Sequence, residues 1–200
     1  MKFITENHGE EYLHNSEIID FENSNIKQIS TILSNNIYTD VDLVKKVFIF
    51  VRDKIKHSAD IAESIITGTA SEVLKSGHGL CFAKAHLLAA ILRSLGIPTG
   101  FCYQGILINA KMPHIVLHGL NAVYLESIGK WIRIDARGNS LNILAEFSIT
   151  EEKLAYKIRN NLGEFDSPII YAKPNNNLID TLRKFTTLND LLLNLPNKLA

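Results

Sequence analysis

The stretch that decides the fold is residues 70–99, which read Ala-Ser-Glu-Val-Leu-Lys-Ser-Gly-His-Gly-Leu-Cys-Phe-Ala-Lys-Ala-His-Leu-Leu-Ala-Ala-Ile-Leu-Arg-Ser-Leu-Gly-Ile-Pro-Thr. From Phe82 to Leu95 the apolar side chains recur at helical spacing and leave little polar surface, so this segment is predicted to be a mostly buried helix. Gly96 suits the position just after a helix, and Pro98 prevents the helix from resuming. We therefore expect the rest of the chain to pack around this helix.

The start of the predicted helix carries a candidate nucleophile, Cys81. Gly77 and Gly79 allow a tight turn before it. A thiol in the first helical turn lies at the positive end of the helix dipole, which favours the nucleophilic thiolate. The unpaired N–H groups there could also hold an oxyanion. The alternative is that Cys81 is a small buried apolar residue, as free cysteines usually are. The two glycines and the buried helix lead us to favour the functional interpretation.

The composition is that of a charge-balanced globular protein. Of the 200 residues, 46% are hydrophobic and 21% charged, and Lys+Arg and Asp+Glu both number 21. With no basic tract and no Gly-rich phosphate loop, we expect neither a nucleic-acid nor a membrane partner. The N-terminus lacks the apolar core of a signal peptide, and two cysteines make no disulfide framework. A cytoplasmic location is therefore expected.

The remaining pattern changes from helical to alternating along the chain. A helix is expected from about Val41 to His57, capped by Thr39 or Asp40. After the central helix the period becomes two, which predicts successive strands. We expect a single α+β domain over residues 1–200, with its core at about 40–148 and additions at both ends. The strands are predicted at 101–108, 115–125, 130–136 and, less distinctly, 143–148.

A thiol nucleophile needs a base and a group that orients that base, and the predicted strands offer both. His118 lies on the second strand and Asp135 on the third. A two-residue turn at 128–129 would place both side chains on one face of the sheet, but four residues out of register, roughly 13 Å apart. In that register His118 lies opposite Asn139, and a Cys-His-Asn arrangement is also workable. Strand parity supports Asp135, while the register leaves the choice open.

Three sequence blocks, in this order, resemble the transglutaminase-like superfamily, which includes bacterial cysteine proteases, peptide N-glycanases and transglutaminases. The resemblance implies a papain-like or transglutaminase-like core, in which a central helix bearing the cysteine packs on an antiparallel sheet. It also implies that Cys81 is the nucleophile, His118 the general base and acid, and Asp135 the orienting carboxylate. We therefore prefer Asp135 over Asn139. The blocks are Gly-His-Gly-Leu-Cys-Phe-Ala-Lys at 77–84, His-Gly-Leu-Asn-Ala-Val-Tyr-Leu at 118–125 and Lys-Trp-Ile-Arg-Ile-Asp at 130–135.

Other polar residues are candidates for contacts with a substrate or an oxyanion. These are Gln104 on the first strand, His78 before the cysteine, and Asn139. Gln104 could equally be an ordinary surface residue. His57 and Asp60 could line the cleft, or belong to a solvated helix end.

A zinc site is an alternative use of the histidines. His78 and Cys81, together with His114 and His118, supply residue types that bind zinc. However, two residues four apart on an extended strand lie about 13 Å from each other. One of the second pair would have to leave the strand to share an ion. We therefore expect no metal and no other cofactor.

The sequence thus predicts a thiol-dependent enzyme that attacks an amide or acyl group and forms a thioester. We expect a hydrolase, either a cysteine protease or an amidase, acting on a peptide, protein or other amide or acyl substrate. One alternative is acyl transfer to an amine, as in transglutaminases. Another is acyl transfer from a thioester donor, as in arylamine acetyltransferases. The last is a non-catalytic binding module on the same fold.

Overall fold

The computed structural model describes residues 3–6, 9–109 and 112–200, and helix α4, Cys81–Ser94, runs through its centre. Every residue from Phe82 to Arg93 is buried. Gly96 follows the helix in the left-handed conformation, with φ 77°, which glycine adopts without steric cost. The predicted buried central helix is confirmed, with its first residue one position earlier than expected.

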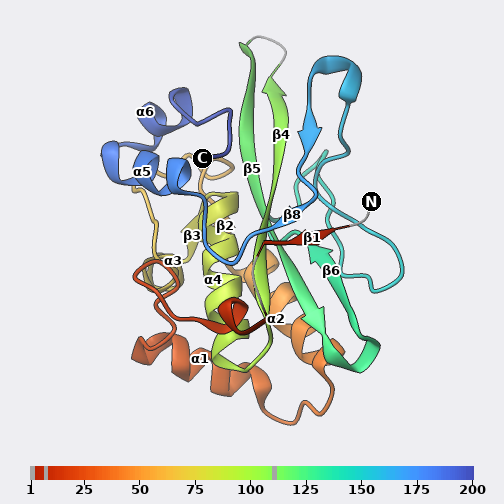
Figure 1. Ribbon diagram of the computed structural model, residues 1–200. Helices are drawn as coiled ribbons and strands as arrows, with labels where there is room; N and C mark the ends of the chain where they lie inside the picture. Colours follow the sequence, from red (N-terminus) through yellow and green to blue (C-terminus); the bar gives the residue numbers. More distant parts are fainter. Residues whose placement is uncertain (1–2, 7–8, 110–111) are drawn as a thin grey trace.

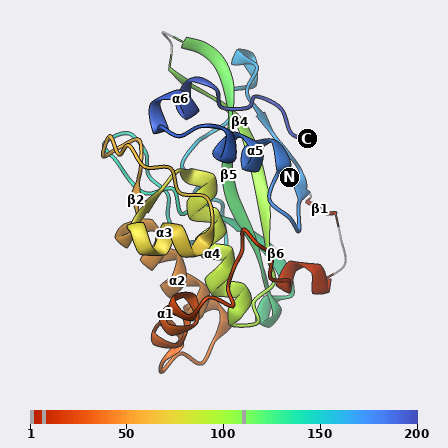
Figure 2. The ribbon, with the colours of Figure 1, turned by 90° about the vertical axis from the view of Figure 1, so that its left-hand side faces the viewer.

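Other helices pack around α4 and leave one side of it for the sheet (Figures 1 and 2). In Figure 1, α1 and α2 lie near the lower end of α4, and α5 and α6 lie at the upper left. Thr39 caps α2 by accepting a hydrogen bond from Asp42 N–H. The bounds are α1 Ser24–Ser34, α2 Asp40–Lys54, α3 Ala70–Ser76, α5 Asn176–Lys184 and α6 Leu188–Leu193.

A four-stranded antiparallel sheet forms the other layer, in the order β6-β5-β4-β7. Its two long strands form the hairpin that crosses the middle of Figure 1, and α4 packs against β5. The fold is therefore α+β, with the helix that starts at the cysteine packed on an antiparallel sheet, as predicted. The strands are β4 Thr99–Asn109, β5 Met112–Leu125, β6 Lys130–Ile134 and β7 Phe165–Asp166.

Short elements complete the architecture. Two parallel two-residue ladders are present: β1 Ile4–Thr5 pairs with β8 Ile169–Ile170, and β2 Lys56–His57 pairs with β3 His78–Gly79. The described residues also contain single 3-10 turns at η1 Gly9–Leu13, η2 Glu126–Ile128 and η3 Asn160–Leu162. Among the described residues, no helix is both long and apolar enough to cross a membrane.

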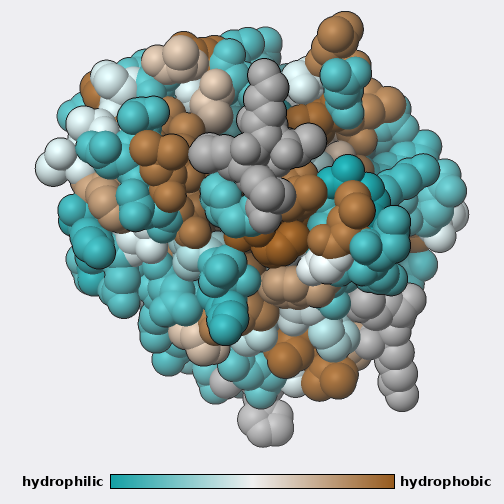
Figure 3. Space-filling model, turned by 90° about the horizontal axis from the view of Figure 1, so that it is seen from above, coloured by the Kyte–Doolittle hydropathy of each residue, from teal (hydrophilic) through white to brown (hydrophobic). Residues whose placement is uncertain are grey.

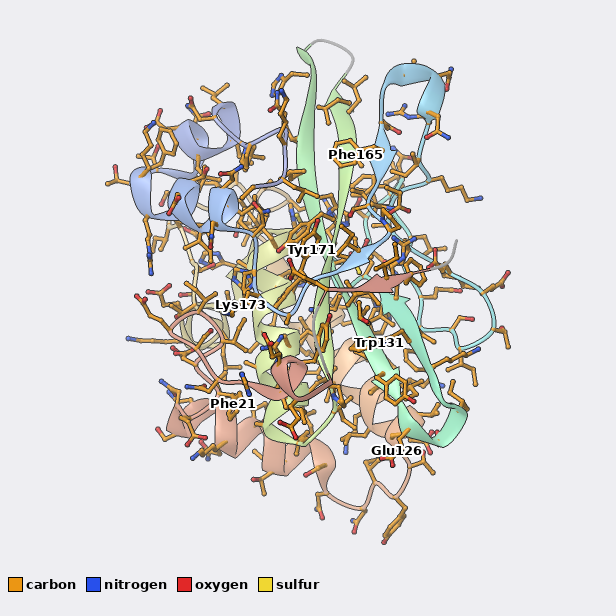
Figure 4. The ribbon with its side chains drawn as sticks, in the orientation of Figure 1. Phe21, Glu126, Trp131, Phe165, Tyr171 and Lys173 are labelled. Carbon is orange, nitrogen blue, oxygen red and sulfur yellow. The ribbon has the colours of Figure 1, made fainter. Side chains whose placement is uncertain are left out.

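The sheet carries an apolar cluster on each face, because side chains alternate along its strands. Phe101 and Tyr103 belong to the main core with α4, whereas Cys102 belongs to a smaller cluster with Tyr12. Trp131, labelled on β6 in Figure 4, closes that smaller cluster, with its ring centroid 4.8 Å from that of Tyr12. The N-terminal segment and the segment around β8 thus pack on the face of the sheet that α4 does not cover.

The β5–β6 hairpin differs from the predicted register. Leu125 pairs with Lys130 and Asn121 with Ile134, so the connection is the four-residue loop Glu126–Gly129 rather than a two-residue turn. Gly129 ends the 3-10 turn of this loop with φ 63°. The two additional loop residues shift the pairing by two positions and preserve strand parity.

Two further expectations about secondary structure are wrong. Helix α2 ends at Lys54, so His57 lies on β2 instead of at a helix end. The segment 143–148 forms no strand and makes only an isolated bridge between Ser140 and Ile143. Of its apolar residues, Leu144 is exposed, Ala145 is buried, and Phe147 packs against the core with its ring centroid 6.1 Å from that of Phe48.

Candidate active site

The thiol of Cys81 lies at the first residue of α4 and is partly buried. The residue before it, Leu80, provides no side-chain cap, so the N–H groups of the first turn are free of a competing side-chain acceptor. Gly77 adopts φ 72° and ends α3, which lets the chain turn from α3 into α4 within a few residues. The helix start therefore combines a thiol with backbone donors.

His118 and Asp135 meet although they come from different strands. His118 lies on β5, and Asp135 follows the last residue of β6. The observed register places Asp135 two positions from His118 along the hairpin instead of four, because the connecting loop is longer than predicted. His118 Nε2 donates to Asp135 Oδ2 at 2.8 Å, and both side chains are buried.

The Asp135 carboxylate is held by three donors. Besides His118, it accepts hydrogen bonds from the backbone N–H of Arg137 at 3.1 Å and of Ala155 at 3.0 Å. Burial alone would raise the pKa of Asp135, but the charge of His118 and these hydrogen bonds hold the pKa below its usual value. The carboxylate therefore stays ionised and can orient the imidazole.

The thiol and the imidazole shift each other's pKa in opposite directions. Burial would raise the pKa of Cys81, but the charge and hydrogen bonding of His118, together with His57, lower it to about 5. Burial would lower the pKa of His118, but Asp135 and Cys81 raise it to about 10. Between these pH values the favoured form is a thiolate next to an imidazolium.

A cavity of about 320 Å³ opens onto the thiol. His118 and Cys81 line it together with apolar side chains from several elements, so most of its wall is apolar. The ring of Tyr156 packs edge-on against His118, with 4.9 Å between the centroids. Figure 3 looks down on the molecule from the hairpin end and shows apolar groups exposed among hydrophilic ones. The apolar lining residues are Ala59, Leu80, Phe82, Ile106, Val116, Leu117, Leu192 and Leu195.

The three other candidates, Gln104, His78 and Asn139, do not line the cavity. Gln104 is opposite His118 in the β4–β5 register, but its amide donates to Asp166 at 3.1 Å and it does not line the cavity. The His78 ring bonds to the Ser58 hydroxyl at 3.0 Å and also lies outside the cavity lining. Asn139 is exposed, and its side chain accepts from Ala145 N–H at 2.8 Å. Among these, only Gln104 is adjacent to the site.

The site also contains residues that the sequence left open or did not indicate. His57 and Asp60 line the cavity, which decides the question of their position in favour of the cleft. Tyr156 has no signal in the sequence, because it lies in an irregular segment far from the motifs. Within the described part of the chain, no three His, Cys, Asp or Glu side chains are grouped so that they could hold a metal ion.

The comparisons with known proteins agree with this fold. A family model described as the transglutaminase-like superfamily matches residues 27–136, more than half of the chain. The chain therefore belongs to the transglutaminase-like superfamily. No curated protein matches its sequence.

The solved structures that match this chain are of longer chains. A candidate cysteine protease from Cytophaga hutchinsonii is 17% identical with a TM-score of 0.53, over 66% of this chain and 43% of that one. The periplasmic domain of TgpA from Pseudomonas aeruginosa is 18% identical with a TM-score of 0.46, over 62% of this chain and 45% of that one. A structure described as a TGase has the same identity and TM-score, over 88% of this chain and 48% of that one. The chain thus spans less than half the length of each, and the first of them shows a shared fold.

Proposed function

We propose that this protein is a thiol-dependent acyl-transfer enzyme. Cys81 is the nucleophile, His118 the general base and acid, and Asp135 the group that orients His118. The observation that carries the proposal is the position of the Cys81 sulfur, at an uncapped helix start and next to an imidazole whose other nitrogen is held by a buried carboxylate. Membership of the transglutaminase-like superfamily supports the same assignment, because the resemblance of the three sequence blocks to that superfamily implies these roles.

The reaction proceeds in two steps. The Cys81 thiolate attacks the carbonyl carbon and forms a C–S bond, while the carbonyl oxygen becomes an oxyanion that the N–H groups of the first turn of α4 stabilise. The His118 imidazolium gives its proton to the leaving amine, the C–N bond breaks and a thioester remains. His118 then takes a proton from the acceptor as the acceptor attacks the thioester, and the sulfur leaves as thiolate.

Water is the acceptor that we propose, because the thiol is only partly buried and the cavity reaches it from the surface. The substrate class is an amide or acyl compound with an apolar group next to the scissile bond, since most of the cavity wall is apolar. The products of hydrolysis are then a carboxylic acid and an amine. An amine acceptor would instead give a new amide.

The pH dependence of alkylation tests the state of the thiol. The thiolate is the reactive form of the thiol. With increasing pH, the iodoacetamide rate constant at Cys81 should therefore rise through an inflection near the Cys81 pKa of about 5 and then level off. An ordinary cysteine instead gains reactivity near its usual pKa of about 8.5. His118→Ala should move the inflection toward that value. An inflection of the unaltered protein above pH 8 would contradict the proposal.

Acyl-enzyme formation tests the chemistry. With p-nitrophenyl acetate, we expect a burst of nitrophenol and an intermediate that is one acetyl group heavier, located at Cys81 by mass spectrometry. Cys81→Ser should form no thioester. If an added primary amine appears in the product in place of water, the acceptor is an amine. Absence of any acyl adduct from esters, thioesters and peptide amides would overturn the proposed activity.

A further inference from the structure

A second imidazole reaches the thiol from a part of the chain outside the three motif blocks. The parallel ladder β2–β3 pairs His57 with Gly79, and Ser58 N–H donates to Gly79 O at 3.1 Å. Gly79 is two residues from Cys81, so this ladder fixes His57 relative to the nucleophile. Both side chains line the same cavity, and the His57 ring contributes, after His118, to lowering the pKa of the thiol.

The carboxylate of Asp60 lies next to the Nδ1 atom of this imidazole. Asp60 Oδ1 lies 3.6 Å from His57 Nδ1, and the His57 side chain is only 9% exposed. Within the described residues, His57 Nδ1 is buried without a hydrogen-bond partner. Arg137 fixes Asp60 by donating to both carboxylate oxygens, at 2.7 and 2.8 Å. Asp60 is therefore held next to His57 Nδ1, within ion-pair distance.

Arg137 connects the two imidazole–carboxylate pairs. Its side chain holds Asp60, and its backbone N–H donates to Asp135. Its guanidinium is largely buried, with 7% of the side chain exposed, and its pKa is raised: burial opposes the charge, but the hydrogen bond to Asp60 outweighs it. Arg137 thus binds both carboxylates: Asp135, which contacts His118, and Asp60, which lies next to His57.

We propose that His57, supported by Asp60, is a further catalytic residue that donates a second hydrogen bond to the Cys81 sulfur. This inference rests on the proposed function. The sulfur is the attacking thiolate in the first step and the leaving thiolate in the second, so a fixed donor stabilises it in both. His57 neither gains nor loses a proton in either step. The proton transfers belong to His118 alone.

The pH profile of alkylation is the readout that a merely structural role would not move. Besides His57, the charged and titratable groups around the sulfur come from several elements. They are His118 and His114 from β5, Tyr103 from β4, Asp60 from the segment after β2, and Arg137 and Tyr156 from the segment after β6. All of these stay in place when only His57 is changed. A change in the inflection can then be assigned to the lost imidazole.

The experiment compares His57→Ala and His57→Phe with the unaltered full chain. Because a hydrogen bond to a charged group contributes about 1.5–3 kcal/mol, the loss should raise the alkylation inflection by about one to two pH units. His57→Gln keeps a side-chain N–H donor and should restore most of the shift. Lys56→Ala changes the exposed neighbour on the same strand and should leave the profile unchanged. Circular dichroism and Tm establish that each variant is folded.

The outcomes separate this inference from the proposed function. If the unaltered protein has an inflection near pH 5, and His118→Ala moves it but both His57 variants do not, the role of His57 is overturned and the proposed function stands. If neither His57→Ala nor His57→Phe folds, His57 is a structural residue and the inference is likewise overturned. If the unaltered thiol behaves as an ordinary cysteine, the proposed function itself fails.

Discussion

Lys84 shows how one buried cation holds the parts of the site together. It lies on α4 with no exposed surface, and its ammonium donates to three backbone carbonyls: Ile55 at 2.6 Å, Arg137 at 2.8 Å and Arg52 at 3.3 Å. Two of these carbonyls belong to the end of α2, just before β2, and the third follows Asp135. Burial lowers the pKa of Lys84 to about 7. The residue therefore joins the end of α2 and the segment after Asp135 to the helix that carries Cys81.

Replacing Lys84 with Met should destabilise the fold. Methionine fills similar space but leaves three carbonyls without their donor, and each buried unsatisfied group costs about 1–3 kcal/mol. The loss of the desolvation cost of the ammonium offsets part of this, so we expect the free energy of unfolding to fall by about 2–4 kcal/mol. Urea denaturation measures the change. Lys45→Met, at an exposed position on α2, is the control and should change the stability little; equal stability of the two variants would contradict the role of Lys84.

At the level of single residues, the sequence predicts a site residue where a local pattern marks its position. Cys81 follows a glycine turn and starts an apolar helix, so its position could be predicted. His118 and Asp135 could be named from the family motifs, and the structure brings them to 2.8 Å. Lys84 gave no such signal, because a lysine that interrupts an apolar stripe usually lies at the surface. Its burial depends on carbonyls that only the folded chain places around it.

Gly119 determines how closely α4 approaches the sheet. A Cβ at this position would lie 2.8 Å from Phe82 Cβ and 3.0 Å from Phe82 Cα, which is closer than carbon atoms approach without strain. Gly119 neighbours His118 on β5, and Phe82 neighbours Cys81 on α4. The missing side chain at 119 therefore allows the thiol and the imidazole to come together. Gly105 likewise allows a close approach, here of the Phe165 ring, which is labelled beside β4 in Figure 4.

Gly119→Ala should separate the two elements and reduce the reactivity of the thiol. The added methyl meets backbone as well as side-chain atoms, so the first turn of α4 must shift, at a cost of about 1–3 kcal/mol. We expect a lower Tm and an alkylation inflection that moves toward that of free cysteine. Gly9→Ala is a matched control, since no atom lies within 4 Å of a Cβ built there. An unchanged inflection in Gly119→Ala would show that the contact does not position the thiol.

At the scale of elements, the periodicity of apolar residues predicts the helices and the long strands, but it does not predict the loops that connect them. The period-two pattern predicted β5 and β6, but the loop Glu126–Gly129 contains a 3-10 turn that adds two residues. The predicted face of each side chain on β5 and β6 is still correct, because the pairing shifts by an even number of residues. The ladder β2–β3 has only two residues on each strand, too few for any alternating pattern. His57 therefore could not be placed from sequence.

For the molecule as a whole, the C-terminal segment supplies one wall of the site. Leu192 and Leu195 line the cavity, and Leu117 N–H donates to Pro196 O at 2.9 Å. Leu117 directly precedes His118, so this hydrogen bond fastens the segment beside the imidazole. Tyr156 reaches the same cavity from another irregular segment. Such long-range contacts carry no local signature in sequence, which is why the motifs indicated Cys81, His118 and Asp135 but not the residues of the cavity wall.

Leu195→Ala should therefore widen the cavity selectively for large reagents. Shortening one apolar wall residue removes several carbon atoms from the lining, so a bulky thiol reagent such as N-phenylmaleimide should gain about tenfold over iodoacetamide in its rate with Cys81. Leu193→Ala is the control, because Leu193 is 53% exposed and does not line the cavity. If the reaction rates of both reagents with Cys81 increase equally in Leu195→Ala, the substitution only makes the C-terminal segment more mobile. Only a change in the ratio of the two rates would show that the C-terminal segment sets the size of the group that reaches the thiol.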